Sequence, residues 1–465
     1  MTPKCFRTLF TFALSTSLAL ELGRFPASYG PPSRPRSSTR GPLDQPDDSG
    51  SGDVSPVSQA KGASAHGTYT GTSFSMLDPL APRIPTSEVG NEKDLSYLLR
   101  YDVYHSLAQI DIPPALRSEF LSPISDQPLS SCLEMLEKFL AEGHFLLAAY
   151  LSASILTSSL VSSTDSQLIL ALFYTRLACL ELSGNTIMAA QESKALEDLS
   201  STFYYVESPV EVSGAENAQN HSTLPRHIVP WPLRVLAVRL QSIGFGDSRR
   251  GIGGLYEIGL EARREIMRPD LTDGERKIWK ERLADLGIRN VNALIEMGDL
   301  GAARRSLASL RISSPGEVTD SRKALLFLLI GDLDAAREVI GESGTSSETF
   351  LQPLLSMAEG RYADAVTEWH ALSERRAGET DEGMISQNLA VCLLYTGRLN
   401  EARQVLERLV QADNSFGSLV FNLSTVYELC SDKSLQMKTS LVGTISQQPV
   451  TGHVNLDRPN ADFKL

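Results

Sequence analysis

A pair of glycines near the middle of the chain comes nearest to a known cofactor motif. Gly244 and Gly246 have the spacing of the first two glycines in a dinucleotide-binding loop, where backbone N–H groups approach a pyrophosphate. The third glycine of that pattern would fall at position 249, where this chain has Arg249. The motif also needs a strand before it, whereas the residues before Gly244 have helical periodicity. We therefore expect no nucleotide or other cofactor at this position.

The side chains that could hold a metal or act as nucleophiles are dispersed. The seven histidines are His66, His105, His144, His221, His227, His370 and His453, and the five cysteines are Cys5, Cys132, Cys179, Cys392 and Cys430, with no C-x-x-C. The chain has no G-x-x-x-x-G-K-[ST], no H-E-x-x-H and no G-x-S-x-G. We expect no catalytic, cofactor-binding or metal site, and so a protein that is not an enzyme.

The charge balance and the cysteines narrow the class of partner and compartment. The formal net charge is −13, which argues against nucleic acid as the main ligand, because phosphate binding needs a basic surface. Cysteines that fall in helical patterns usually behave as small buried hydrophobes, which fits a reducing compartment. We therefore expect a protein partner. The three tryptophans, Trp231, Trp279 and Trp369, could anchor an interface, but on helices of a repeat array we expect them to be core residues.

The helical patterns are joined by a recurring turn, G-x-[L/Y/F]-x-x-A. The glycine supplies a left-handed backbone that ends one helix, the large side chain packs into the angle between helices, and the alanine lets the second helix approach closely. These residues are repeat-turn structural positions, not reactive ones. The four copies at repeat spacing are Gly298/Leu300/Ala303, Gly331/Leu333/Ala336, Gly360/Tyr362/Ala365 and Gly397/Leu399/Ala402; a further copy lies at Gly143/Phe145/Ala148 and a weaker one at Gly184/Thr186/Ala189.

The spacing of these turns predicts the fold. Successive glycines from Gly298 to Gly397 are 33, 29 and 37 residues apart, which brackets the period of about 34 residues of tetratricopeptide repeats. Neither helix of such a pair can cover its apolar face alone, so each pair needs a neighbour. The sequence predicts an all-α, tetratricopeptide-like helical-repeat solenoid of antiparallel helix pairs, preceded by a disordered N-terminal leader.

The composition along the chain divides it into six parts. The first is a leader rich in Pro, Gly and Ser that lacks the periodicity needed to offset ordering entropy. The expected parts are 1–90, the disordered leader with an apolar N-terminal tip; 91–128, a short helical lead-in; 129–204, N-terminal helix pairs, the last helix running to Leu199; 205–228, an exposed acidic loop; 229–446, tetratricopeptide-like repeats; and 447–465, an extended C-terminal tail.

The first 24 residues leave two interpretations open. Lys4 and Arg7 precede an apolar run over residues 9–20, which resembles a secretory signal. The run is interrupted by polar residues and no clear small-x-small cleavage site comes after it, so a wrongly assigned start or an incidental apolar tip is the alternative. Two stretches match the glycosylation acceptor pattern, at Asn220 and Asn422; the second lies inside a helical pattern and does not support a secretory route.

Residues 388–399, where the Gly397 turn ends a buried-looking helix, resemble the C-terminal repeats of the trafficking protein particle (TRAPP) complex subunit 12 family. The resemblance continues through residues 406–411, 420–429 and 434–438, and more weakly at 164–168, 204–205, 233–236 and 279–283. It covers roughly residue 129 to the C-terminus, and the stretch 388–438 is the specific part. The signal-like residues 1–24 depart from what a cytoplasmic family implies, and the leader matches nothing in it.

This resemblance implies a non-enzymatic subunit that contacts the other TRAPP complex subunits. Such a complex tethers vesicles and activates a Rab GTPase in ER-to-Golgi transport, and serves in autophagy; the exchange surface belongs to other, smaller subunits. The implied location is cytoplasmic, with peripheral association to ER and Golgi membranes through the complex. Two alternatives stay open: a generic tetratricopeptide adaptor or co-chaperone, and a secreted helical enzyme.

Overall fold

The structure is a computed structural model of the chain. It describes residues 77–81, 93–107, 128–206, 226–269, 271–310, 317–342, 350–376, 381–414 and 416–448. The expected disordered leader lies outside these residues except for 77–81, as do most of the acidic loop and nearly all of the C-terminal tail.

The described residues fold almost entirely into α-helices, which confirms the predicted all-α repeat fold. The N-terminal helices are α3 (Leu129–Ala141), α4 (Phe145–Leu156), α5 (Ser166–Leu182) and α6 (Thr186–Glu192). The middle helices are α7 (Trp231–Phe245), α8 (Ser248–Ile266) and α9 (Asp273–Glu296). The C-terminal helices are α10 (Leu300–Ser309), α11 (Glu317–Ile330), α12 (Leu333–Glu342), α13 (Leu351–Ala358), α14 (Tyr362–Arg375), α15 (Glu382–Tyr395), α16 (Leu399–Gln411), α17 (Gly417–Cys430) and α18 (Ser434–Gln447).

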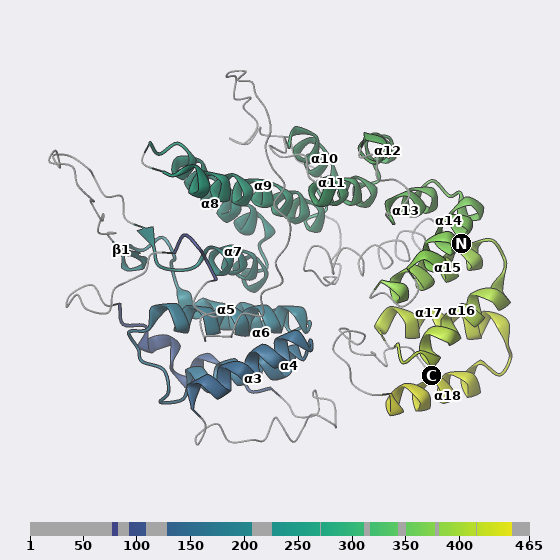
Figure 1. Cartoon of the computed structure of the whole chain (residues 1–465), viewed down its shortest axis with the longest axis horizontal. Helices are drawn as coiled ribbons and strands as arrows, with labels where there is room; N and C mark the ends of the chain where they lie inside the picture. Colours follow the sequence, from purple (N-terminus) through teal and green to yellow (C-terminus); the bar gives the residue numbers. More distant parts are fainter. Residues whose placement is uncertain are drawn as a thin grey trace, which may run out of the picture.

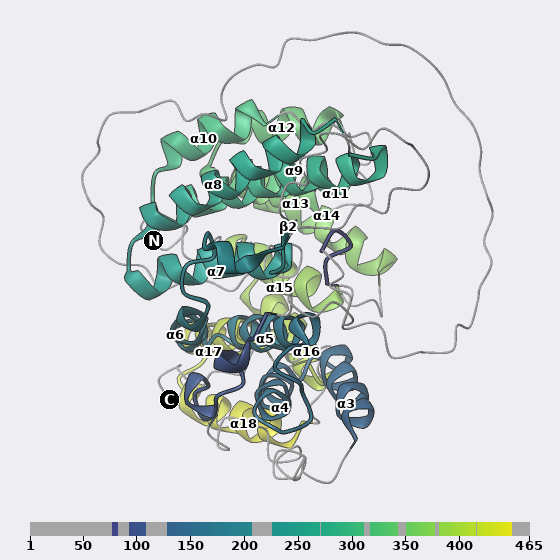
Figure 2. The ribbon, with the colours of Figure 1, turned by 90° about the vertical axis from the view of Figure 1, so that its left-hand side faces the viewer.

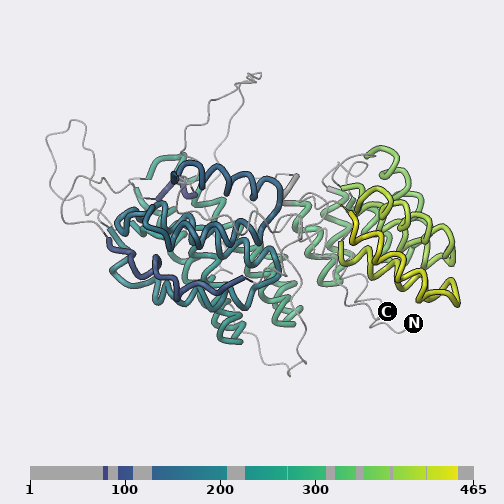
Figure 3. The backbone as a smooth tube through the Cα atoms, turned by 90° about the horizontal axis from the view of Figure 1, so that it is seen from below, coloured from purple at the N-terminus to yellow at the C-terminus, as the bar shows by residue number. Residues whose placement is uncertain are grey.

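Each of these helices packs mainly on the helices next to it along the chain. The stack bends into an open arch, from α3 and α4 at the lower left, through α8 to α11 at the top, to α18 at the lower right (Figure 1). Seen from below, the N-terminal and C-terminal helices form two separate limbs (Figure 3), and in the view from the side α7 lies between the lower helices and the upper layer of α8 to α10 (Figure 2). Nearest-neighbour packing of this kind is the defining property of a solenoid.

The core runs along the stack in three apolar clusters. The first extends from Leu95 to Leu240, the second surrounds Trp231 and Trp279, and the third extends from Ile288 to Leu441. All three tryptophans are buried, and Trp369 is fully so. Helix α15 has nine buried residues of fourteen and is covered by α14 and α16, whereas α16 buries a single face. In this pair the first helix is therefore the more deeply buried of the two.

The turns between paired helices share one hydrogen-bonding pattern. At Gly397, φ is 80°, the Gly397 N–H donates to Leu394 O (3.1 Å) and the Arg398 N–H donates to Leu393 O (2.9 Å). This is the Schellman arrangement, in which a left-handed residue satisfies the last carbonyls of a helix. The same pattern occurs at Gly143, Gly184, Gly246, Gly298, Gly331 and Gly360, whose φ values lie between 63° and 88°.

The alanine five residues after each regular glycine lies at the helix–helix contact. Ala303, Ala336, Ala365 and Ala402 are all 0% exposed, and each belongs to the C-terminal core cluster. The large residue before it is only half-buried in each copy. The small side chain, more than the large one, is therefore what the close approach of the two helices requires.

Two expected helices are shorter or different in the structure. In the described part of the lead-in, residues 93–107, two 3₁₀ turns, Ser96–Leu98 and Tyr101–Val103, stand in place of α-helix, because tertiary contacts hold this part: the Leu95 N–H donates to Ser163 O (3.0 Å). The helix expected to run to Leu199 ends at Glu192 and tightens into a 3₁₀ turn, Ser193–Leu196, where the Ser193 hydroxyl donates to Ala190 O (2.8 Å).

The expected acidic loop begins and ends in a short antiparallel ladder, β1 (Tyr205–Val206) with β2 (Arg226–His227). The His227 side chain holds this ladder in place as a neutral ring. Its Nε2 donates to Leu199 O (2.9 Å), and its Nδ1 accepts from the Val229 N–H (3.0 Å). Burial lowers the pKa of His227 from 6.5 to about 4, with Arg234 adding to the shift.

No described helix combines the length and the apolarity that crossing a membrane needs.

The turn geometry predicts the effect of Gly397→Val. A Cβ at Gly397 would meet nothing within 4 Å, so the cost is the positive φ alone. We expect a loss of about 1 kcal/mol or more in unfolding free energy, measured by urea denaturation. Gly443→Ala, at an open position inside α18, is the matched control and should not destabilise. Equal stability of the valine variant and the parent would contradict the assigned turn.

Ala402→Phe tests the helix–helix contact. A ring at this fully buried position overpacks α15 against α16, and we expect a loss of about 1–3 kcal/mol. The exposed Ala363 on α14 is the control, since Ala363→Phe adds the same ring to solvent. A melting temperature that falls equally in both variants, or in neither, would show that Ala402 is not at the contact.

The pH dependence of stability is set in part by His227. Its folded pKa lies below its unfolded value, so the unfolded chain gains a proton first as the pH falls below 6.5, and stability decreases down to about pH 4. The decrease amounts to at most about 3 kcal/mol. His227→Gln should flatten this part of the stability curve. Identical slopes in the parent and the His227 variant would refute the buried neutral ring.

Candidate functional site

The described residues contain no group of three or more His, Cys, Asp or Glu side chains that could hold a metal ion. The described histidines lie apart from one another. His105, for example, lies beside Glu192, and His370 lies beside Glu374. The four described cysteines are free, and burial raises the pKa of Cys179 and of Cys392 to about 12, so these thiols are protonated at neutral pH. A protonated, buried thiol is a poor nucleophile.

The glycine pair at 244–246 has a structural role. Gly244 lies within α7, and Gly246 ends that helix with φ 63°. Asp247 then caps α8 by accepting from the Arg249 N–H (3.0 Å). A helix, not a strand, precedes the glycines, so the geometry differs from that of a dinucleotide-binding loop.

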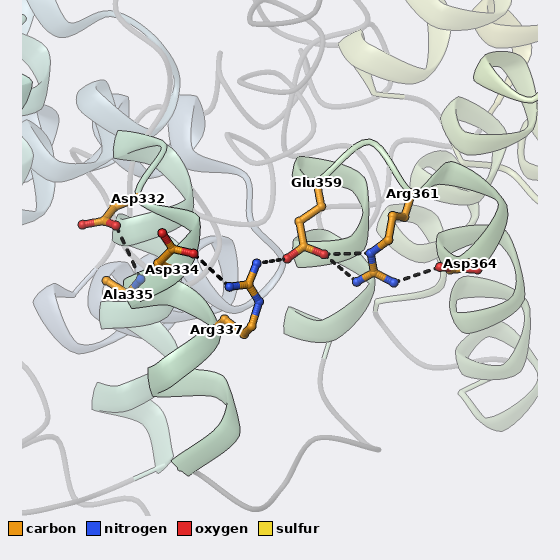
Figure 4. Close-up of polar contacts among 7 residues, drawn as sticks. All are labelled: Asp332, Asp334, Ala335, Arg337, Glu359, Arg361 and Asp364. Atoms are coloured by element: carbon orange, nitrogen blue, oxygen red, sulfur yellow. Dashed lines mark hydrogen bonds and ion pairs between the residues drawn. The ribbon is translucent and has the colours of Figure 1, made fainter.

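The repeat turns of α10 to α14 carry a row of ion pairs, here called the turn edge: Arg304, Asp332, Asp334, Arg337, Glu359, Arg361 and Asp364. Arg304 on α10 pairs with Asp332 (2.5 Å), at the turn between α11 and α12. Figure 4 shows the rest of the row. Its members come from consecutive repeats, so the turn edge links repeats that are otherwise joined by their cores.

Glu359 is the centre of this row. Its carboxylate accepts from Arg337 (2.5 Å) on one side and from Arg361 (2.6 Å and 2.8 Å) on the other (Figure 4). These two hydrogen-bonded guanidiniums lower the pKa of Glu359, which keeps it charged at neutral pH. Arg337 also pairs with Asp334 (2.9 Å), and Arg361 with Asp364 (2.8 Å).

The arginines of the turn edge are open to solvent, whereas Asp332 and Glu359 are largely buried, at 8% and 14% exposed. Arg304 and Arg337 are more than half exposed, at 63% and 56%. Ion pairs with one solvent-exposed partner are screened by water, and surface pairs typically contribute only about 0–1 kcal/mol each. Charges of both signs at fixed positions instead favour partners with the complementary pattern and exclude others.

A hollow of about 550 Å³ lies among α5, α7, α8 and α9. Arg239 of α7 crosses its wall and donates to Glu181 of α5 (2.5 Å) and to Glu296 of α9 (3.0 Å). Arg282 and Arg289, also in the wall, are paired with Asp78 and Asp285. Because these guanidiniums are already neutralised, the hollow is a recess between helices with a mixed lining, and not a site with one sign of charge.

The structure does not gather the sequence-predicted positions at one point. Gly298, Gly331, Gly360 and Gly397 stand at four successive turns, and their alanines lie inside the stack. One of the large turn residues makes a specific contact: Tyr362 stacks on Tyr395 of the next pair, with ring centroids 4.5 Å apart. Leu300, Leu333 and Leu399 are half-buried beside their turns.

Sequence reasoning missed two versions of the turn. Asp413, with φ 59°, takes the glycine position between α16 and α17, where the Asn414 N–H donates to Leu409 O (3.1 Å). Aspartate tolerates the left-handed region, which is the signal that could have found it. Between α7 and α8, Gly251 stands where the pattern has alanine, and a Cβ there would lie 2.5 Å from Ser242 Cβ.

The charged members of the turn edge were also missed. Arg337 and Glu359 are 22 residues apart, a separation that has no meaning until the repeats are stacked. The available signal was weak: acidic and basic residues directly follow or flank the repeat glycines.

Comparison with known proteins gives two informative similarities. The chain is 25% identical over 332 residues to human trafficking protein particle complex subunit 12, which covers 64% of this chain and 42% of the human protein. It is 25% identical over 212 residues to the mouse protein of the same name, covering 42% of this chain and 25% of that protein. The chain thus spans less than half the length of these curated relatives. No family model and no solved structure matches it.

The resemblance noted at residues 388–438 agrees with these similarities. The alignment with the human protein covers 332 residues, so it extends well beyond that stretch. A likeness of that length, in a chain built of successive helix pairs, concerns the array and not one local motif. By its sequence, the chain resembles trafficking protein particle complex subunit 12.

Proposed function

We propose that this protein is a non-enzymatic scaffold subunit of a TRAPP vesicle-tethering complex, acting through protein–protein contacts of its helical repeats. The observation that carries the proposal is the similarity to trafficking protein particle complex subunit 12 over 332 residues, joined to a fold that is a solenoid where described. A stack of helix pairs presents a long surface to which several partners can bind at once.

The finer parts of the proposal rest on the same relationship. The partners are other TRAPP subunits, and a Rab GTPase is engaged indirectly, by smaller subunits that carry the exchange surface. The protein works in the cytoplasm, associates with ER and Golgi membranes peripherally through the complex, and takes part in ER-to-Golgi transport and in autophagy. The turn edge supports a role in partner selection, because its charges are fixed in place by neighbouring repeats.

One structural observation disfavours the co-chaperone alternative. A groove for acidic C-terminal tails needs polar and basic side chains displayed on successive first helices, where Asn388 of α15 and the half-buried Asn422 of α17 recur but basic residues are sparse. Asn388 is 1% exposed and its amide contacts Met384 Sδ (3.3 Å), so it faces the interior. The secreted-enzyme alternative is disfavoured by Ser424, the acceptor-pattern residue two after Asn422, which is buried in α17.

The test is affinity purification of the tagged full chain from cells, with mass spectrometry of the bound proteins. We expect TRAPP subunits to be recovered with the parent and with the surface control Ala363→Phe. Ala402→Phe, which strains the α15–α16 contact, should reduce their recovery per molecule of bait. Recovery of chaperones instead, or entry of the chain into the secretory pathway with glycosylation, would overturn the proposal.

A further inference from the structure

A short stretch of the leader is held against the middle helices. Within the first 92 residues the structure describes Leu77 to Ala81. This stretch forms a turn, in which the Ala81 N–H donates to Asp78 O (3.1 Å) and the Leu80 N–H donates to Asp78 Oδ1 (2.8 Å). An Asp-Pro pair favours such a turn, because the aspartate side chain accepts from the backbone two residues on and Pro79 fixes its own φ.

Asp78 supplies the cap that α7 lacks. The helix begins at Trp231 after Pro230, which has no side chain able to accept a hydrogen bond, and Pro232 has no N–H. The Trp231 N–H is therefore an unsatisfied donor of the first turn. It donates to Asp78 Oδ2 (2.9 Å), from a residue 153 positions away. A carboxylate at this place also interacts favourably with the helix dipole.

Arg282 of α9 completes the recognition of the carboxylate. It pairs with Asp78, and its guanidinium lies over the rings of Trp231 and Trp279, 5.1 Å and 4.6 Å from their centroids. The side chains of Arg282 and Asp78 are only 10% and 6% exposed. A guanidinium this buried needs a carboxylate, because an unpaired buried charge is strongly unfavourable. The neighbouring Arg234 is already paired with Glu261, so it does not compete for Asp78.

The third contact is apolar. Leu80 packs against the cluster of Trp231, Trp279 and their neighbours on α7, α8 and α9. Trp231, Pro232 and Arg282 also line the hollow of about 550 Å³, so space remains beside the bound stretch. Asp78 makes the cap and the ion pair, and Leu80, two residues further on, makes the apolar contact, a combination of polar and apolar contacts that suits the binding of a short peptide.

We propose that α7, α8 and α9 form a docking site for a short Asp-Pro-Leu peptide, which the chain's own residues 78–80 occupy in cis. The site does not depend on covalent linkage to the leader, since each contact is made by the carboxylate, the turn or the leucine. A peptide of this sequence supplied in trans therefore binds the same site once the internal copy is removed. This inference is independent of the proposed function, because it concerns one groove and not the partners of the array.

The experiment uses the full chain and a fluorescein-labelled peptide of residues 73–85, followed by fluorescence anisotropy. In the vacated chain, Asp78→Ala with Leu80→Ala, the peptide should bind saturably. In the parent chain the internal copy competes at high effective concentration, so binding should be weaker by about tenfold or more. A peptide carrying the Asp78→Ala change should not bind the vacated chain.

Two further variants separate recognition from folding. Adding Arg282→Gln to the vacated chain should abolish binding, whereas adding Arg289→Gln, an arginine of the same helix paired with Asp285, should leave it unchanged. Circular dichroism checks that each variant remains helical. The proposal is overturned if the peptide binds parent and vacated chain equally, if it binds neither, or if the vacated chain unfolds, which would make residues 78–80 an integral part of the core.

Discussion

The mutual covering of neighbouring helices is the constraint on which the rest of the structure depends. Helix α15 is buried on nearly all sides, so it is stable only with α14 and α16 in place, and α16 in turn needs α15 for its single apolar face. The left-handed residue between two helices decides whether the second can fold back at the required angle. A stack of such pairs has no single central core. Its stability is a sum of contributions from each repeat and from the contacts between neighbouring repeats. The residues that the stack itself does not use for packing are those on its exposed surfaces and edges.

Local signals were sufficient for the fold. Helix α5, for example, lies between two local signals, a capping aspartate at Asp165 and a left-handed glycine at Gly184, and its apolar residues have helical periodicity. The lead-in could not be predicted, since Leu95 and Leu98 are buried through contacts with residues far along the chain. The turn edge had the same difficulty: its pairs exist only after the repeats are in register. The turn at Asp413 was missed for a different reason: an aspartate, and not a glycine, adopts the left-handed backbone conformation there.

The irregular segments are anchored by buried arginines. Arg176 of α5 pairs with Glu192 (2.6 Å), donates to His105 O of the lead-in (2.8 Å) and lies over the ring of Tyr104. Arg282 does the same for the stretch at Asp78, over the rings of Trp231 and Trp279. A segment of a few residues buries too little apolar area to hold itself on the array, so a fixed, fully paired guanidinium supplies the missing contacts. Its planar geometry also sets where the segment binds, which a purely apolar contact does not.

The arrangement of charge has a consequence for how a partner would act on the array. Repeats from α10 to α14 meet through their cores, and the turn edge adds weak, exposed pairs between the same neighbours. A partner that contacts two or more repeats at once would connect helix pairs that otherwise contact only their immediate neighbours. Binding to the folded state stabilises it by mass action, and here the gain is shared by every repeat that the partner spans. A partner that spans several repeats would therefore stabilise the solenoid as a whole and not a single helix pair.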